Sequence, residues 1–242
     1  IGVRRFGFIN WIGFKSLWLK ECNRFMAVWQ QTLLSPLVSS LLFLSVLSLA
    51  IGNDRGDVLG YSFISFLAPG LIAMSILTQS FSHSVSSLMI AKIQGNIVDM
   101  LYAPLSALEV SMAIILASLT RSFLIAIISI VVFSLIVEIP INNFLYIFIF
   151  SFLSSFILGS LGFITGLWAE KFDHTATITN FVITPLSFLS GAFYSIEKLP
   201  EFFQTISHIN PFFYMIDGFR YGFLGASDGS ISIGILYLTI LS

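Results

Sequence analysis

The sequence predicts an all-α membrane protein, a bundle of six membrane-spanning helices, from three observations. Hydrophobic residues make up 57% of the 242 positions and charged residues only 10%. The mean hydropathy is +0.96. The apolar residues gather in long uncharged stretches that short polar segments separate. Soluble domains carry about 25% charged residues, so this chain could not cover its surface in water, whereas a bilayer tolerates an apolar exterior.

Residues 10–32 are predicted to form an amphipathic helix in the membrane–water interface. Lys15, Lys20 and Arg24 share this segment with a single stripe of apolar residues at gaps of three or four: Trp11, Phe14, Trp18, Cys22, Phe25 and Trp29. A basic helix lined with tryptophan is typical of membrane surfaces. The alternative is an ordinary soluble helix that faces a protein core.

Six segments are predicted to span the membrane: 33–51, 61–81, 117–137, 144–168, 175–196 and 230–242. The first is an uncharged run that, at about 1.5 Å per residue, just crosses a hydrocarbon core of ~30 Å. Arg121 in the third span is expected near one interface, where its side chain can snorkel. The sixth segment is too short to cross alone, and we expect residues beyond Ser242 to complete it.

Lysine and arginine near the span ends predict that both termini are cytoplasmic. Arg4, Arg5, Lys15, Lys20 and Arg24 lie before the first span, and Lys92 and Lys171 fall on the same side. The opposite side receives Arg55, Lys198 and Arg220. This excess of basic residues marks the cytoplasmic face of a membrane protein.

Residues 195–229 connect the fifth and sixth spans but are unusually aromatic for an external loop. Pro200 followed by Glu201 predicts a helix start, and Asn210-Pro211 predicts its end. A second apolar helix follows and carries Asp217 and Arg220 three residues apart. We interpret the pair as a re-entrant hairpin that dips into the outer leaflet. The alternative is an external cap that contacts no substrate.

Two further segments are candidates for protein contacts. The polar interval from Lys92 to Glu109 could bind a partner on the cytoplasmic face, or it could be a solvated connector. In the fourth span, Gly162 and Gly166 continue a repeat of small residues that begins at Ser151 and includes Ser155 and Gly159. Such faces let helices approach closely, either within one chain or between subunits.

Composition and missing motifs disfavour several classes of function. The net charge is −1 and no five like charges occur together, so no nucleic acid partner is expected. The sequence has no G-x-x-x-x-G-K-[ST], G-x-S-x-G or H-E-x-x-H motif. We therefore expect no cofactor, no catalytic residue and no enzymatic activity in this chain. Ionisable residues are scarce within the spans, which favours an energy source outside the bilayer.

Cysteine and histidine usage predicts no metal site. Cys22 is the only cysteine, which excludes an intrachain disulfide and a cysteine-based zinc site, and a packing role is expected for it. His83, His174 and His208 are far apart in the sequence. Each is expected at an edge of the membrane.

The stretch from Thr184 to Gly225 resembles the signature of the ABC-2 type permease family, in its branch of bacterial drug, polysaccharide and lipid exporters. The matching elements are P-L-x-F-L-S-G-x-F-Y, L-P, N-P and G-F-R-Y-G. They contain Pro185, Gly191, Phe193, Tyr194, Pro200, Asn210, Pro211, Asp217 and Arg220 or adjoin them. Glu21-x-x-Arg24-Phe25, Pro69-Gly70 and Ala103-Pro104 also match, so the resemblance covers nearly the whole chain.

This resemblance implies a permease subunit of an exporter in the bacterial cytoplasmic (inner) membrane. Two permease chains, expected as a homodimer, would pair with two copies of a cytoplasmic ABC ATPase that hydrolyses the ATP. The segment 10–32 would be the connecting helix, and the Lys92–Glu109 loop the coupling helix, with Lys92, Asn96, Asp99 and Pro104 as its expected contacts. Residues 170–175 would add a smaller contact. The first and fifth spans would form the dimer interface, and the 195–229 hairpin would cap the path.

The expected cargo is a drug-like, lipid or saccharide molecule, and membrane lipid surrounds the chain. Two other functions stay open from the residues alone. One is a non-transporting membrane scaffold or regulator of an ATPase. The other is an intramembrane enzyme, which would need a serine with a nearby histidine at membrane depth.

Overall fold

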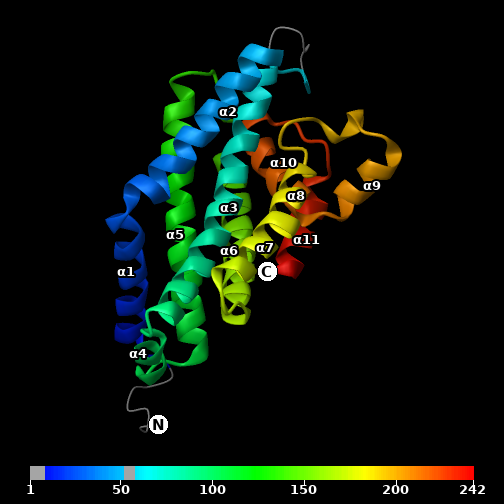
Figure 1. Ribbon diagram of the computed structural model, residues 1–242. Helices are drawn as coiled ribbons and strands as arrows, with labels where there is room; N and C mark the ends of the chain where they lie inside the picture. The colour runs from blue at the N-terminus through cyan, green and yellow to red at the C-terminus, as the bar shows by residue number, and fades with distance from the viewer. Residues whose placement is uncertain (1–8, 52–57) are drawn as a thin grey trace.

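The computed structural model describes residues 9–51 and 58–242, which fold as a bundle of α-helices. Four helices in this part of the chain are long and apolar enough to cross a membrane: Gln30–Ala50, Phe63–Ile93, Ala107–Ser134 and Phe144–Trp168. Figure 1 shows α1 along one side of these long helices and a cluster of short helices, α9 to α11, on the other.

The first helix, α1 (Trp11–Ala27), ends earlier than the sequence predicted. The side chain of Asn10 caps its start by accepting a hydrogen bond from the backbone N–H of Gly13 at 3.0 Å. Val28 ends it, because its φ of −118° and ψ of 37° leave the helical region. A π-helical turn, η1 (Gln30–Leu34), then leads directly into α2 (Ser35–Ile51). Trp29 and the residues after it therefore belong to the next helix.

The buried line of α1 differs from the predicted aromatic stripe. Leu17, Glu21 and Phe25 are the buried residues of this helix, while Trp11 is 67% exposed. Trp18 is half-buried, and its indole N–H donates to the hydroxyl of Thr120 on α5 at 3.3 Å. The helix packs on α5, and its buried line includes a carboxylate, Glu21, which accepts from the hydroxyl of Ser87 on α3 and which the stripe of apolar residues did not indicate.

The helices α3 (Phe63–Ile93), α5 (Ala107–Ser134) and α6 (Phe144–Trp168) form the centre of the bundle. Both α3 and α5 continue well beyond the predicted spans, α3 past Phe81 and α5 before Ala117. A Cβ on Gly162 or Gly166 of α6 would meet α3, at Phe81 and at Leu88 respectively. The small residues of α6 therefore serve packing within this chain.

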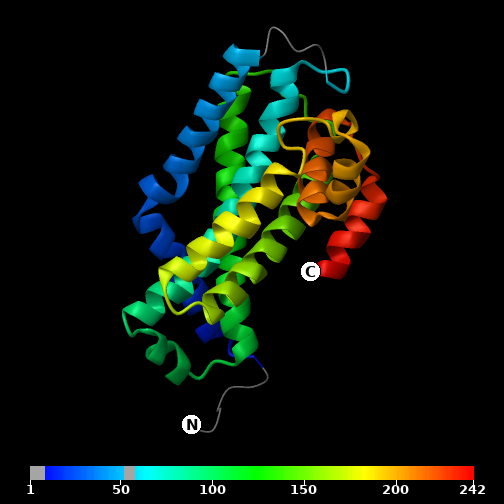
Figure 2. The ribbon, with the colours of Figure 1, turned by 45° about the vertical axis from the view of Figure 1, so that its right-hand side comes forward.

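The predicted fifth span is a continuous helical run that ends before Ile196. It consists of α7 (Phe172–Ile178), a second π-helical turn η2 (Thr179–Ile183) and α8 (Thr184–Phe188). Figure 2 shows this run crossing the bundle obliquely in front of α6. Beyond Phe188 the chain turns, with Gly191 at a φ of +73°, a left-handed conformation that glycine adopts without strain.

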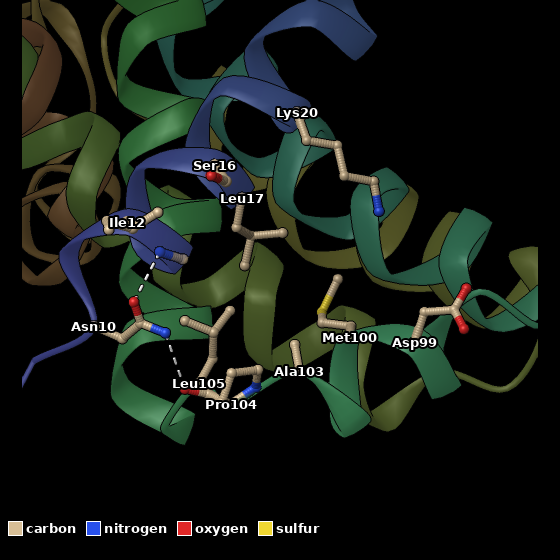
Figure 3. A pocket seen from close by; sticks show the side chains of 11 residues that line it. Asn10, Ile12, Ser16, Leu17, Lys20, Asp99, Met100, Ala103, Pro104 and Leu105 are labelled. Carbon is tan, nitrogen blue, oxygen red and sulfur yellow. Dashed lines mark hydrogen bonds between the residues drawn. The ribbon is translucent and has the colours of Figure 1, made fainter. Parts of the chain in front are cut away.

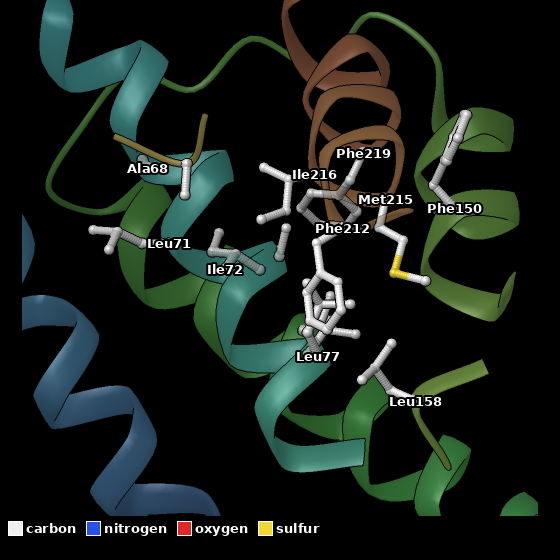
Figure 4. Packing of buried hydrophobic residues seen from close by; sticks show 14 of the residues in the cluster. Ala68, Leu71, Ile72, Leu77, Phe150, Leu158, Phe212, Met215, Ile216 and Phe219 are labelled. Carbon is white, nitrogen blue, oxygen red and sulfur yellow. The ribbon is translucent and has the colours of Figure 1, made fainter. Parts of the chain in front are cut away.

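The 195–229 segment contains the two predicted helices. After a short 3-10 turn, η3 (Ile196–Lys198), α9 (Glu201–Ile209) is exposed and α10 (Pro211–Leu224) is buried between α3 and α6. In Figure 4, Met215, Ile216 and Phe219 of α10 lie between Ile72 on α3 and Phe150 on α6, within one buried cluster. The last helix, α11 (Ile231–Leu241), has 11 residues and lies beside α10.

Candidate functional site

One end of the bundle carries a short connector helix, α4 (Ile97–Tyr102), between α3 and α5. Gly95, at a φ of +77°, reverses the chain after α3. At the start of α5, Ser106 and Glu109 form a capping box, in which each side chain accepts from the backbone N–H of the other. Glu109 also accepts from the backbone N–H of Asn10 at 2.6 Å. A single buried carboxylate therefore joins the start of α1 to the start of α5.

A groove of about 480 Å³ lies between α1 and α4. Figure 3 shows Leu17 and Met100 pointing into it and Lys20 and Asp99 at its rim. At its other end the side-chain amide of Asn10 donates to the carbonyl of Pro104 at 3.3 Å. The groove thus has an apolar floor and a charged rim, and both helices that form it are tied to α5.

The residues expected to contact an ATPase have different positions at this end. Lys92 is turned inward, because its ammonium group donates to the carbonyls of Leu167 at 2.6 Å and Ala169 at 2.8 Å, at the end of α6. Asn96, Asp99 and Pro104 are exposed. Lys92 is therefore placed to hold α3 against α6, and the other three are available on the surface.

The apolar face of α4 was not predicted from the sequence. Val98, Leu101 and Tyr102 are 48%, 77% and 86% exposed, and Leu108 at the start of α5 is 77% exposed. Their spacing of three and one within α4 is readable from the sequence as one side of a helix. An exposed apolar patch of this kind, set among polar residues, is typical of a surface that another protein covers. We call Val98, Leu101, Tyr102 and Leu108 the α4 knob.

The segment from Glu170 to Thr175 lies where α6 meets α7. Glu170, Lys171, Phe172 and Asp173 are exposed, and Thr175 is buried. Phe172 is 50% exposed and begins α7. The predicted second contact surface is therefore accessible.

On the α9–α11 side, the charged residues of the signature are internal braces. Asp217 is 2% exposed, and its carboxylate accepts from the backbone N–H groups of Asp228 at 3.0 Å and Gly229 at 2.9 Å. Arg220 is 1% exposed and donates to the carbonyl of Gly191 at 2.8 Å, with its guanidinium 3.9 Å from the centre of the Phe66 ring. Arg220 thus holds the turn that follows α8, and Asp217 holds the loop that follows α10.

The remaining signature residues stabilise the same region. The side chain of Asn210 caps α10 by accepting from the backbone N–H of Phe212 and donates to the carbonyl of Leu186 at 2.8 Å. Pro211 occupies the first turn of α10, and Pro200 precedes α9. Pro185 lies in the first turn of α8. The hydroxyl of Tyr194 donates to the carbonyl of Phe188 at 3.1 Å.

A second groove, of about 290 Å³, lies between α2, α3 and α8. One part of its wall is polar and includes Gln31, Ser39, Ser75, Thr78 and Gln79. The other part is aromatic: Phe193 stacks on Phe188 with ring centres 5.6 Å apart and lies 6.5 Å from Phe43. We call this the α2–α3–α8 groove. A wall that is polar on one side and aromatic on the other suits an amphipathic molecule.

His83 and Cys22 lie outside the two grooves and the α4 knob, and the sequence carries an expectation for each. His83, which is expected at an edge of the membrane, is fully buried within the chain against Phe25. Cys22 is half-buried on α1, and burial raises the pKa of its thiol. A raised pKa disfavours the reactive thiolate, which agrees with a packing role.

The long apolar helices define a multi-helix membrane protein, and comparison with known families gives its class. The chain matches the model of the ABC-2 type transporter family over residues 13–224 and belongs to this family.

It is similar to the inner membrane transport permease YadH of Escherichia coli, with 35% identity over 97% of this chain and 92% of the relative. Nodulation protein J of Neorhizobium galegae is 25% identical over 97% of this chain and 90% of the relative. Nodulation protein J of Rhizobium leguminosarum bv. trifolii is 27% identical over 90% of this chain and 83% of the relative.

Proposed function

We propose that this chain is the permease subunit of an ABC exporter in the bacterial inner membrane, with ATP hydrolysed by a separate cytoplasmic subunit. The observation that carries the proposal is the α4 knob, an apolar surface at one end of a chain of the ABC-2 type transporter family. The sequence has no nucleotide-binding motif, so a transporter of this family needs a partner to supply the energy. The inner-membrane location follows the name of the Escherichia coli relative.

The α4 knob is the proposed main contact with the ATPase. Exposed polar and backbone groups lie beside it, at Asn96, Asp99 and Pro104. Lys92 joins the end of α3 to the end of α6. The exposed start of α7 around Phe172 is the proposed second contact. Two ATPase copies would each press on one permease of a homodimer. Because Glu109 joins α1 to α5, a push on α4 would reach both helices.

The topology proposed is six spans with both termini cytoplasmic. The run 172–188 and α11 are the fifth and sixth spans in this proposal, with α9 and α10 as a re-entrant hairpin between them. The burial of α10 between α3 and α6 supports a position at membrane depth, since backbone there must be enclosed by protein. The α2 helix is the least buried of the four long apolar helices, which leaves its surface for lipid or for the second permease copy.

The proposed cargo is an amphipathic drug-like, lipid or saccharide molecule that moves outward along the α2–α3–α8 groove. The groove is bounded by the first and fifth spans of this topology, and its mixed polar and aromatic wall supports such a cargo. Phe193 of the family signature lies in this wall, which links the signature to the path.

Co-purification of the full-length chain with its ATPase tests the proposal. The wild type should retain the ATPase in mild detergent, and Leu101→Glu or Tyr102→Glu should release it. The matched control is Ile141→Glu, which places the same charge on a residue 57% exposed in the loop between α5 and α6, at the opposite end of the bundle. An ATPase that stays bound in both knob variants, or no ATPase with the wild type, would refute the proposal.

A further inference from the structure

A third cavity, of about 560 Å³, lies where α1 meets α3 and α5. Its polar wall includes Arg24, Gln31, Gln79, Ser82, His83 and Arg121. We call it the arginine cavity. These residues come from three helices and from the π-helical turn η1, so no single segment of the sequence reveals them as a group.

Hydrogen-bond donors in this cavity lack partners within residues 9–51 and 58–242. Arg121 is 7% exposed and donates from one nitrogen, Nη2, to the carbonyl of Thr32 at 3.3 Å and to the side-chain oxygen of Gln79. Its Nε is buried without a partner. His83 is fully buried, and neither ring nitrogen makes a hydrogen bond. Buried polar groups are nearly always paired, so orphaned donors at a cavity wall point to a ligand that pairs them.

The charge of the cavity is positive. None of the residues that line it is acidic. The carboxylate of Glu21, beside the cavity, is already engaged: it lies 2.9 Å from Arg24 and 3.9 Å from His83 Nε2, and it accepts from the hydroxyl of Ser87 at 2.7 Å. Glu21 therefore balances Arg24 and leaves Arg121 without an ion-pair partner in the described part of the chain. An uncompensated buried cation is costly, and an anion in the cavity would remove this cost.

We propose that the arginine cavity binds a phosphate-type anionic head group. Guanidinium groups suit phosphate oxygens, because their N–H donors are fixed in one plane and their charge is permanent. Arg121 would supply Nε and the far guanidinium nitrogen, Arg24 would face the same anion, and Gln31, Ser82 and His83 would add neutral donors. The volume is sufficient for a head group rather than a whole lipid.

The arginine cavity adjoins the α2–α3–α8 groove. Gln31 and Gln79 line both spaces. A molecule whose anionic head lies beside Arg121 can therefore extend its apolar part toward Phe43, Phe188 and Phe193. Whether the bound molecule is cargo rests on the proposed function, whereas binding of the anion does not depend on transport.

Binding by the full-length chain, without ATPase or ATP, tests the proposal. The protein is placed in phosphatidylcholine nanodiscs, and fluorescent phosphatidic acid is titrated by energy transfer. The wild type should bind it, and Arg121→Gln should weaken binding by about tenfold or more, with partial recovery in Arg121→Lys. Lys15→Gln is the matched control, since it removes an equal charge from an exposed position on α1 outside the cavity.

Because Arg121→Gln could also disturb folding, a second pair of variants changes the cavity without removing a hydrogen bond. The side chain of Gln31 is exposed, so Gln31→Glu should weaken binding and Gln31→Lys should strengthen it. An equal response to Lys15→Gln and Arg121→Gln, or no opposite effect of the Gln31 pair, overturns the proposal.

Inorganic phosphate distinguishes the two sources of the anion. If millimolar phosphate displaces the lipid from wild type but not from Arg121→Gln, the anion alone is the ligand. If it does not compete, and lipid binding still depends on Arg121, the ligand is the lipid-borne head group. No binding of either probe overturns the proposal. Loss of ATPase co-purification with intact phosphatidic acid binding would reject the proposed function alone.

Discussion

Replacement of Gly162 by alanine should loosen the contact between α3 and α6. The new Cβ would lie well inside 3.0 Å of the Phe81 carbonyl oxygen and 3.1 Å from both the Phe81 carbonyl carbon and Ser84 Cβ. The first obstacle is backbone, so it cannot rotate away. The two helices must separate by roughly 1 Å to reach a normal non-bonded distance. Alanine gains up to about 1 kcal/mol of helix propensity, whereas overpacking costs about 1–3 kcal/mol.

Gly159 on the same helix provides the matched comparison. A Cβ there also comes inside 3.0 Å of a neighbour, but that neighbour is the hydroxyl oxygen of Ser118, and the next atoms are 3.6 Å away. Gly159→Ala should therefore destabilise the protein less, and adding Ser118→Ala should remove the clash altogether. No second substitution of a side chain can relieve Gly162→Ala, because the clash is with the main chain.

The assay is thermal unfolding of the purified chain in detergent. The measured quantity is the fraction of protein that remains monodisperse at each temperature. The expected order of melting temperatures is Gly159→Ala with Ser118→Ala above Gly159→Ala, and Gly159→Ala above Gly162→Ala. If Gly162→Ala had the same melting temperature as the double variant, α3 and α6 would not be packed through this glycine.

Three further substitutions remove hydrogen bonds that join separate segments at the two ends of the bundle. Lys92→Met removes the donor at the end of α6 and should cost about 1 kcal/mol in unfolding free energy, with faster proteolysis near Ala169. Glu109→Gln weakens the tie between α1 and α5 by about 1–2 kcal/mol, which unfolding in detergent can measure, and should lower coupled ATPase activity. Asp217→Asn leaves one acceptor for two N–H donors and should cost about 1–3 kcal/mol, with increased hydrogen exchange at Asp228.

Several elements could be predicted because their signals are local. The start after Pro200 appears in the structure as the start of α9, and the break at Asn210-Pro211 as the end of α9 and the start of α10. Proline lacks a backbone donor and fixes its own φ, so these signals survive in any tertiary context. The long apolar helices were readable for a similar reason, since uncharged runs of this length are typical of membrane spans and rare in soluble proteins.

Other features depend on contacts between distant residues and could not be predicted. Val28 ends α1 without a glycine, a proline or a capping side chain that would mark the position. The burial of His83 within the chain depends on the contact of α3 with α1, which the sequence around His83 does not indicate. Lys92 has the sequence context of a surface charge, and only the end of α6 beside it turns it inward. For His83 and Lys92, the residue that determines the side-chain position lies far away in the sequence. For Val28, no local sequence signal marks the end of the helix.

The two π-helical turns determine which side chains line the α2–α3–α8 groove. One, η1, precedes α2, and the other, η2, precedes α8, so each helix that flanks α3 in the groove carries a turn with one surplus residue. When a surplus residue migrates by one position, each side chain that it passes rotates by about 100° around the helix axis. The angular position of the polar and aromatic groups along the groove is therefore set by where these two turns lie in the chain.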